Sequence, residues 1–166
     1  PYDTMETVIG ITGNAVGSLK EMQVAYSQVE MKDNQSAIDV DAVLAALRPN
    51  TRVVLIQRSR GYAWRASLQP HEMKAVIDAV HAARPDVFVM VDNCYGEFIC
   101  ENEPTHFGAD VCVGSLIKNP GGGLAPTGAY LAGTNRAIGR IEARLTAPGL
   151  GREVGSYAAS YQPFYQ

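Results

Sequence analysis

Of the four lysines in the chain, Lys118 has the surroundings in which a lysine does chemistry. It follows the mostly apolar run 111–117 and precedes an Asn-Pro pair and three glycines, whereas the other three lysines have the settings of solvated charges. Burial lowers the pKa of a lysine and leaves a nucleophilic amine, as Schiff-base chemistry requires. From local context alone, a lysine whose stem packs while its ammonium reaches water is an equally good interpretation.

Asp92 is the second candidate, because it directly follows the apolar run 87–91. A carboxylate at the end of such a run is costly to bury unless a partner pairs with it. In enzymes that use pyridoxal 5′-phosphate (PLP), an aspartate pairs with the protonated pyridine nitrogen, so that the ring accepts electrons from the substrate. Taken alone, Asp92 reads more often as the cap of a turn or helix. With Lys118 at a neighbouring strand end, the cofactor interpretation is favoured.

Arg58 and Arg60 follow the predicted strand 51–57, whose centre is apolar, and they form the remaining group of polar candidates. Two guanidinium groups at a strand end can grip a carboxylate or a phosphate, which makes both residues candidate substrate ligands; surface arginines are the alternative. The glycines at 121–123 are not followed by a GK[ST] sequence, which argues against a P-loop. No GxGxxG follows a first strand, so a nucleotide-binding Rossmann domain is also disfavoured.

Short apolar runs alternate with helical stretches, which predicts an α/β fold with a largely parallel sheet. Strands are expected at 23–29, 51–57, 87–91, 109–113 and 127–132, and helices at 2–9, 18–22, 39–47, 70–83 and 135–145. Ligands of open α/β sheets bind beyond the carboxyl ends of the strands. The polar groups at 58–60, 92–95 and 115–119 all follow predicted strands, so we expect a site there.

The composition bounds the class of protein. The chain has 166 residues, 46% of them hydrophobic and 19% charged, which is typical of a globular domain with a core. A net charge of −3 gives no basic excess for nucleic acid or an anionic membrane, and no apolar run approaches a membrane span. The three cysteines and the three histidines (His71, His81 and His106) lack metal-ligand spacing, so no metal site is predicted. Sparse, odd-numbered cysteines fit a reducing cytoplasm.

Four segments resemble one family. VDNCYGEF (91–98) and GSLIKNPGGG (114–123), in that order and spacing, resemble the Cys/Met-metabolism branch of fold-type I PLP enzymes. Within it they are most similar to the methionine γ-lyase-like group that includes aluminium-resistance proteins. PYDTMETVIG (1–10) and IQRSRGYAWR (56–65) are similar to the same group, so the resemblance covers most of the chain.

The resemblance implies the fold in more detail. It implies the central, mostly parallel sheet of an aspartate aminotransferase-like large domain, incomplete at both ends. Residues 1–148 would be part of the PLP-binding large domain, and 149–166 a linker toward a missing C-terminal domain. The start at Pro1, without a methionine, and the aromatic run at 161–166 fit this expectation of a fragment.

The resemblance also implies a role for each site residue. Lys118 would hold the cofactor covalently and shuttle the α-proton, and Asp92 would bind the pyridine nitrogen. Tyr95 would hydrogen-bond the phenolic oxygen of the cofactor, and Ser115 would bind its phosphate. Tyr2 would stack on the ring or assist departure of the leaving group.

The implied function is that of a PLP-dependent carbon–sulfur lyase, acting by β- or γ-elimination on a sulfur-containing amino acid such as methionine or cystathionine. The resemblance further implies a cytoplasmic homo-oligomer, a dimer or a tetramer, with a small-molecule substrate and neither nucleic acid nor membrane as partner. The residues alone fit a PLP-dependent aminotransferase as well. An inactive fragment that keeps only the fold is a further alternative, because the expected upstream phosphate loop and the small C-terminal domain lie outside this sequence.

Overall fold

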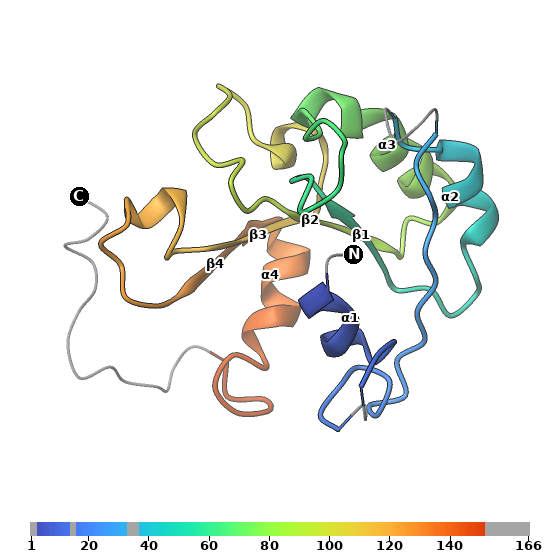
Figure 1. Cartoon of the computed structure of the whole chain (residues 1–166). Helices are drawn as coiled ribbons and strands as arrows, with labels where there is room; N and C mark the ends of the chain where they lie inside the picture. Colours follow the sequence, from blue (N-terminus) through green and yellow to red (C-terminus); the bar gives the residue numbers. More distant parts are fainter. Residues whose placement is uncertain (1–2, 14–15, 33–36, 152–166) are drawn as a thin grey trace.

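A four-stranded sheet forms the centre of the molecule (Figure 1). The computed structural model describes residues 3–13, 16–32 and 37–151. In sheet order the strands are β1 (Val53–Gln57), β2 (Phe88–Asp92), β3 (Val111–Ser115) and β4 (Ala129–Gly133). The first three run parallel, and β4 is antiparallel to β3. The mostly parallel α/β sheet expected from the sequence is therefore confirmed.

Helices lie on both sides of this sheet. They are α1 (Asp3–Ile9), α2 (Val40–Ala46), α3 (Lys74–Ala83) and α4 (Asn135–Glu142), with 3₁₀ turns η2 (Pro70–Met73), η3 (Pro104–Phe107) and η4 (Asn119–Gly121). Figure 1 shows α2 and α3 above the sheet and α1 and α4 below it. Asp39 caps α2, since its side chain accepts a hydrogen bond from the backbone N–H of Ala42 at 3.0 Å.

Two predictions for the N-terminal third are wrong. The segment 23–29, expected as a strand, belongs to no strand of the described sheet, and 18–22 forms turns instead of a helix. Gln23 has a φ of 60°, a left-handed conformation that interrupts an extended chain. Val24 and Tyr26 are 49% and 44% exposed. The alternation of apolar and polar residues in this segment therefore belongs to an irregular chain on the surface and not to a strand.

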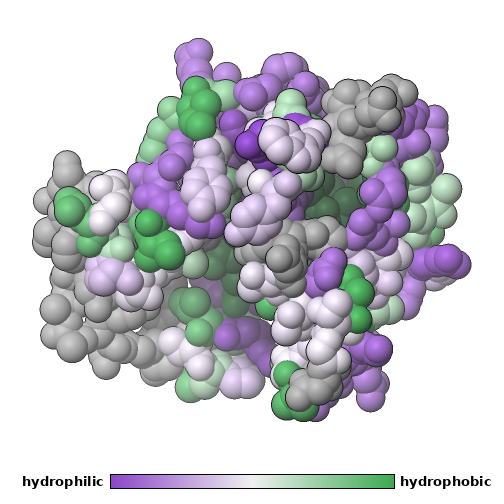
Figure 2. Space-filling view, viewed as in Figure 1, coloured by the Kyte–Doolittle hydropathy of each residue, from purple (hydrophilic) through white to green (hydrophobic). Residues whose placement is uncertain are grey.

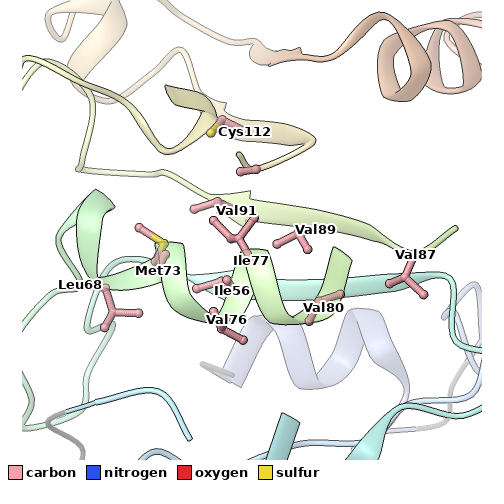
Figure 3. Close-up of a cluster of buried hydrophobic side chains, with 11 residues drawn as sticks. Ile56, Leu68, Met73, Val76, Ile77, Val80, Val87, Val89, Val91 and Cys112 are labelled. Atoms are coloured by element: carbon pink, nitrogen blue, oxygen red, sulfur yellow. The ribbon is translucent and has the colours of Figure 1, made fainter. Parts of the chain in front are cut away.

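The hydrophobic core lies between the sheet and α3 (Figure 3). Met73, Ile77 and Val80 have no exposed surface, and they pack with Val89 and Val91 of β2. Burying each large aliphatic side chain contributes about 1.5–3 kcal/mol to folding. This packing fixes which face of each strand points toward α3.

Strand alternation then gives the carboxyl end of the sheet two different faces. Val91 is paired in register with Ile56 and Cys112, which are also buried in the core. Asp92 is paired with Val113, so Asp92 and Ser115 point away from α3. Polar residues that follow the strands are thus divided between the core face and the opposite face.

The surface carries a mixture of side chains. Figure 2 shows hydrophilic and hydrophobic residues interspersed over one side of the molecule. Trp64, Phe98 and Leu124 are among the exposed large apolar residues, at 93%, 78% and 70% exposed. Of the helices that the structure describes, none combines the length and apolar character needed to cross a membrane.

Asp110 joins several elements through one buried carboxylate. Its Oδ2 accepts a hydrogen bond from the backbone N–H of Val89 and lies against Nε2 of His81 on α3, each at 2.8 Å. Its Oδ1 lies 3.8 Å from the guanidinium of Arg136 on α4, and the residue is 7% exposed. The carboxylate therefore links β2 to helices on both sides of the sheet.

We expect Asp110→Ala to lower the free energy of unfolding by about 1–3 kcal/mol, because the substitution leaves the buried Val89 N–H without an acceptor. Urea unfolding followed by circular dichroism measures the loss. Asp78→Ala is the matched control: Asp78 is exposed and pairs with Lys74 one helical turn away, so its loss should be about 0.5 kcal/mol or less. Equal losses in the two variants would contradict the linking role of Asp110.

Candidate active site

Four of the predicted cofactor residues gather at the carboxyl ends of β2 and β3. Asp92 and Ser115 are the last residues of these strands, and Tyr95 and Lys118 each follow three residues later. Nζ of Lys118 lies 4.4 Å from the centroid of the Tyr95 ring, which is a cation–π contact. The strand ends therefore bring together an amine, a carboxylate, a phenol and a hydroxyl.

Cys94 is the residue that connects this group. Its backbone N–H donates to Oδ1 of Asp92 at 3.1 Å. Its thiol lies close enough to Asp92 and Lys118 for the charges of both side chains to act on the thiol's pKa. Asp92 and Lys118 thus share one neighbour. Sequence reasoning gave Cys94 no role, although its place two residues after a strand that ends in Asp92 is the signal that it borders the site.

The charged groups around Cys94 shift the pKa of its thiol. Burial raises the pKa of the thiol, and the hydrogen bond and negative charge of Asp92 raise it further. The backbone of Ser115 and the positive charge of Lys118 act in the opposite direction without cancelling the rise. At neutral pH the thiol therefore keeps its proton.

Of the two interpretations of Lys118, the structure favours the charged ammonium over an amine with a lowered pKa. Burial does lower the pKa of this half-buried amine, but Cys94, Tyr95 and Asp92 together raise it above the ordinary lysine value. The net rise follows from three groups that gain negative charge on deprotonation and surround one cation. At neutral pH the side chain is an ammonium, so a reaction of Lys118 with an aldehyde requires prior loss of that proton.

Ser115 and Lys118 are held in one tight turn. The backbone N–H of Lys118 donates to the carbonyl of Ser115 at 3.3 Å, and that of Ile117 donates to the Ser115 hydroxyl, also at 3.3 Å. Both side chains remain half-buried. The turn keeps the hydroxyl and the amine at the same end of β3.

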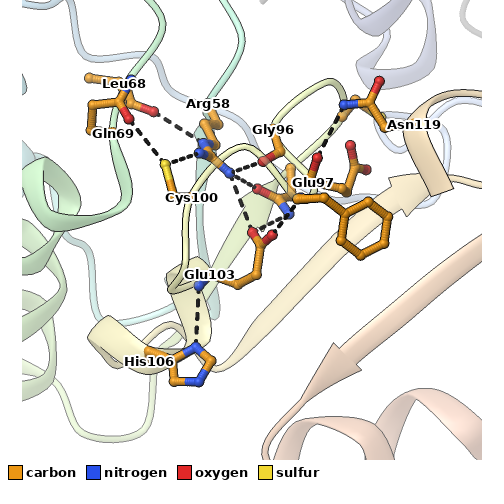
Figure 4. A network of polar contacts seen from close by, with 12 residues as sticks. Arg58, Leu68, Gln69, Gly96, Glu97, Cys100, Glu103, His106 and Asn119 are labelled. Atoms are coloured by element: carbon orange, nitrogen blue, oxygen red, sulfur yellow. Dashed lines mark hydrogen bonds and ion pairs between the residues drawn. The ribbon is translucent and has the colours of Figure 1, made fainter.

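Arg58 lies away from these residues, on the core face of the sheet, and is 3% exposed. Its guanidinium donates to the carbonyls of Leu68 (3.2 Å) and Gly96 (2.7 Å), to Oδ1 of Asn93 (2.7 Å) and to Oε2 of Glu103 (3.3 Å) (Figure 4). Protein groups thus occupy its donors. The predicted role of Arg58 as a substrate ligand does not fit this placement, and the physical reason is burial among internal acceptors.

The other two predicted residues stand apart from the group. Arg60 is exposed, and its guanidinium lies 5.8 Å from the centroid of the Trp64 ring in the loop after β1. Tyr2 lies outside the described residues. The roles predicted for Arg60 and Tyr2 stay predictions.

The gathered groups fit PLP in chemical type. An amine suits the aldehyde, a carboxylate suits the pyridine nitrogen, a phenol suits the phenolic oxygen and a hydroxyl suits the phosphate. All four belong to strand ends or to the turns after them, where α/β folds bind ligands. Across the described ranges, no group of three or more His, Cys, Asp or Glu side chains is placed to hold a metal ion.

Comparison with known proteins extends this picture. The family model described as methionine gamma-lyase matches residues 1–166. The Bacillus subtilis protein YnbB is 51% identical over 168 residues, which is 100% of this chain and 39% of YnbB. The chain therefore spans about two fifths of the length of that relative.

Solved structures with a similar fold support the same relationship. A carbon-sulfur lyase involved in aluminium resistance from Clostridium novyi is 47% identical and superposes with a TM-score of 0.82 over 91% of this chain and 36% of that one. Cystathionine gamma-lyase from Lactobacillus plantarum is 18% identical with a TM-score of 0.61, over 82% of this chain and 31% of that one. The second likeness concerns the fold alone.

We expect alkylation of Cys94 to need a higher pH than that of an ordinary cysteine, because burial and Asp92 both disfavour the thiolate. Asp92→Asn removes a negative neighbour and should lower the pH of half-maximal alkylation. Lys118→Met removes a positive neighbour and should raise it. Iodoacetamide pulses across pH, read by peptide mass spectrometry, give the profile.

Cys112 serves as the internal control in the same digests, because burial raises the pKa of its thiol to about 12. Its alkylation should stay negligible up to pH values at which Cys94 reacts. Shifts of the Cys94 profile in the same direction in both variants would contradict the arrangement of Asp92 and Lys118 around this thiol.

Proposed function

The chain belongs to the methionine gamma-lyase family, and from this membership we propose that it forms the PLP-binding part of a carbon–sulfur lyase. The observation that carries the proposal is the placement of Asp92 and Lys118 at the ends of neighbouring strands, with the Lys118 amine 4.4 Å from the centroid of the Tyr95 ring. The family relationship selects the chemistry, and the geometry supplies the residues for it.

PLP, when bound, supplies an electron sink for the α-carbon of an amino acid. Lys118 would hold the cofactor and then move the α-proton. Asp92 would keep a proton on the ring nitrogen, Tyr95 would donate to the phenolic oxygen, and Ser115 would bind the phosphate. Each of these side chains is at a strand end or in the turn that follows, so their spacing is set by the sheet.

The raised pKa of Lys118 adds a requirement to this assignment. The ammonium has to lose its proton before the amine bonds to an aldehyde. The Tyr95 ring lies against Lys118. We propose that water takes this proton directly, because the Lys118 side chain is only half-buried.

A sulfur-containing amino acid is the proposed substrate class. The 47% identical structure from Clostridium novyi is described as a carbon-sulfur lyase, and release of a thiol by elimination is the reaction that this name implies. Since the chain spans 39% of YnbB, we expect the groups that bind the substrate carboxylate, and the contacts of a cytoplasmic homo-oligomer, to involve further segments.

We expect borohydride reduction in the presence of PLP to fix the cofactor covalently on Lys118. The test uses this chain by itself and, in parallel, this chain in place of the matching segment of YnbB. Peptide mass spectrometry locates the added mass. Lys118→Ala should abolish the label, whereas Lys74→Ala, which removes an exposed lysine of α3, should leave it. A label that persists in Lys118→Ala would contradict the assignment.

The same hybrid protein decides the reaction class. With a sulfur amino acid it should release a thiol, ammonia and a keto acid, and Lys118→Ala should lower the rate at least about 100-fold, as loss of a catalytic base does. Transfer of nitrogen to an added keto acid, without thiol release, would establish the aminotransferase alternative.

A further inference from the structure

We propose that Arg58 is a positioning residue, which fixes the turn that carries Tyr95 beside Lys118 while lying on the opposite face of the sheet. The inference rests on the proposed function, because it gives Arg58 an effect on a cofactor that it would not touch. It also replaces the predicted role of Arg58 as a substrate ligand.

The two ends of the turn at residues 93–96 both accept hydrogen bonds from the guanidinium of Arg58, and the contact with Gly96 is drawn in Figure 4. Nη1 donates to Oδ1 of Asn93 and to the carbonyl of Gly96, both at 2.7 Å. The N–H of Gly96 donates to the carbonyl of Asn93 at 2.8 Å, and the N–H of Asn93 donates to Val113 of β3, also at 2.8 Å. The two ends of the turn are therefore tied to one cation and to the sheet.

Glu103, the residue just before η3, completes the anchor. Its Oε2 lies 3.3 Å from Nη1 of Arg58 and accepts a hydrogen bond from Nδ2 of Asn93 at 2.9 Å. Arg58 and Asn93 are 3% and 2% exposed. A buried arginine with a carboxylate and several carbonyls as partners has one well-defined geometry, because its planar fork satisfies them together.

Gly96 shows how closely the turn and the guanidinium fit. A Cβ atom built at this position would lie 2.6 Å from Cζ and 2.7 Å from Cδ of Arg58. Such distances are too short for carbon atoms, so any side chain at residue 96 would displace Arg58 or the turn. Glycine at this position is therefore a consequence of the arginine behind it.

Tyr95 lies between the two anchored residues and depends on them. Its φ of 68° is in the left-handed region, which a tyrosine enters at a cost. With 58% of its surface exposed, packing of the ring does not account for this conformation. The anchors at Asn93 and Gly96 enforce it, and they thereby set the position of the ring against the Lys118 ammonium, 4.4 Å from Nζ to the centroid.

Two variants test this without removing any site residue. Arg58→Lys keeps the positive charge and loses the planar fork, and Gly96→Ala keeps Arg58 and introduces the collision. Arg52→Lys is the matched control, because Arg52 is an exposed arginine just before β1, at the far end of the strand from Arg58. A cooperative thermal unfolding transition verifies that each variant is folded. If one of the two test variants does not fold, the other by itself tests the proposal.

The first readout uses the chain without cofactor. Cys94 lies within the turn, and its thiol pKa is raised mainly by burial. Release of the turn should move the pH of half-maximal alkylation down toward the ordinary cysteine value in Arg58→Lys and Gly96→Ala, and leave it in place in Arg52→Lys. Folded test variants that keep the wild-type profile would overturn the proposal.

The second readout is the dissociation constant for PLP, measured by absorbance titration of the hybrid with YnbB. Arg58→Lys should raise it about tenfold or more, the usual effect of losing a supporting shell. Tyr95→Ala should raise it too, and the double variant should show no further rise, because both changes act through one ring. Fully additive effects would overturn the proposal. Wild-type protein that binds no PLP would overturn the proposed function instead, and the Cys94 profile would then decide the role of Arg58 alone.

Discussion

The two-residue period of β2 governs the chemistry at this end of the sheet. Val91 points into the core against α3, so Asp92 has to point the other way and Asn93 returns to the core side. A shift of one residue would bury Asp92 among the valines and expose Asn93. The apolar packing of α3 therefore selects which carboxylate reaches Lys118, although no atom of the helix belongs to the site.

Below the site, the core side of the strand ends is polar and closed. Burial raises the pKa of the Tyr130 hydroxyl, which donates to Oε1 of Glu97 at 3.1 Å, and Gly114 leaves the space that these two side chains fill. Glu97 Oε2 is the one buried side-chain oxygen or nitrogen in the described ranges without a hydrogen-bond partner. Such a nearly complete network specifies one arrangement, because each lost partner would leave a buried group unsatisfied.

Much of the sheet and of the candidate site could be predicted from the sequence. Continuous apolar runs and the amphipathic stretch 70–83 define the parallel strands and α3, and the placement of Lys118 and Asp92 after neighbouring runs brings them together. The face of Arg58 was also readable, since it is two residues beyond the buried Ile56. The direction of the pKa shift of Lys118 could not be predicted from the sequence. It depends on three neighbouring side chains that come close to the amine only in the folded turn.

The conformation of the loop after β2 is fixed by contacts with charged side chains more than by apolar packing. Tyr95 and Phe98 both have positive φ values and both are exposed, so neither conformation is explained by its own side chain. Tyr95 is held through the contacts of Arg58, and Phe98 donates its N–H to Oε1 of Glu103 at 3.0 Å. One ion pair, between a buried arginine and a half-buried glutamate, thus supports two strained residues. Because strain of this kind persists only where the surroundings over-determine it, the Arg58–Glu103 pair is the element that fixes the backbone of this loop at an otherwise exposed surface.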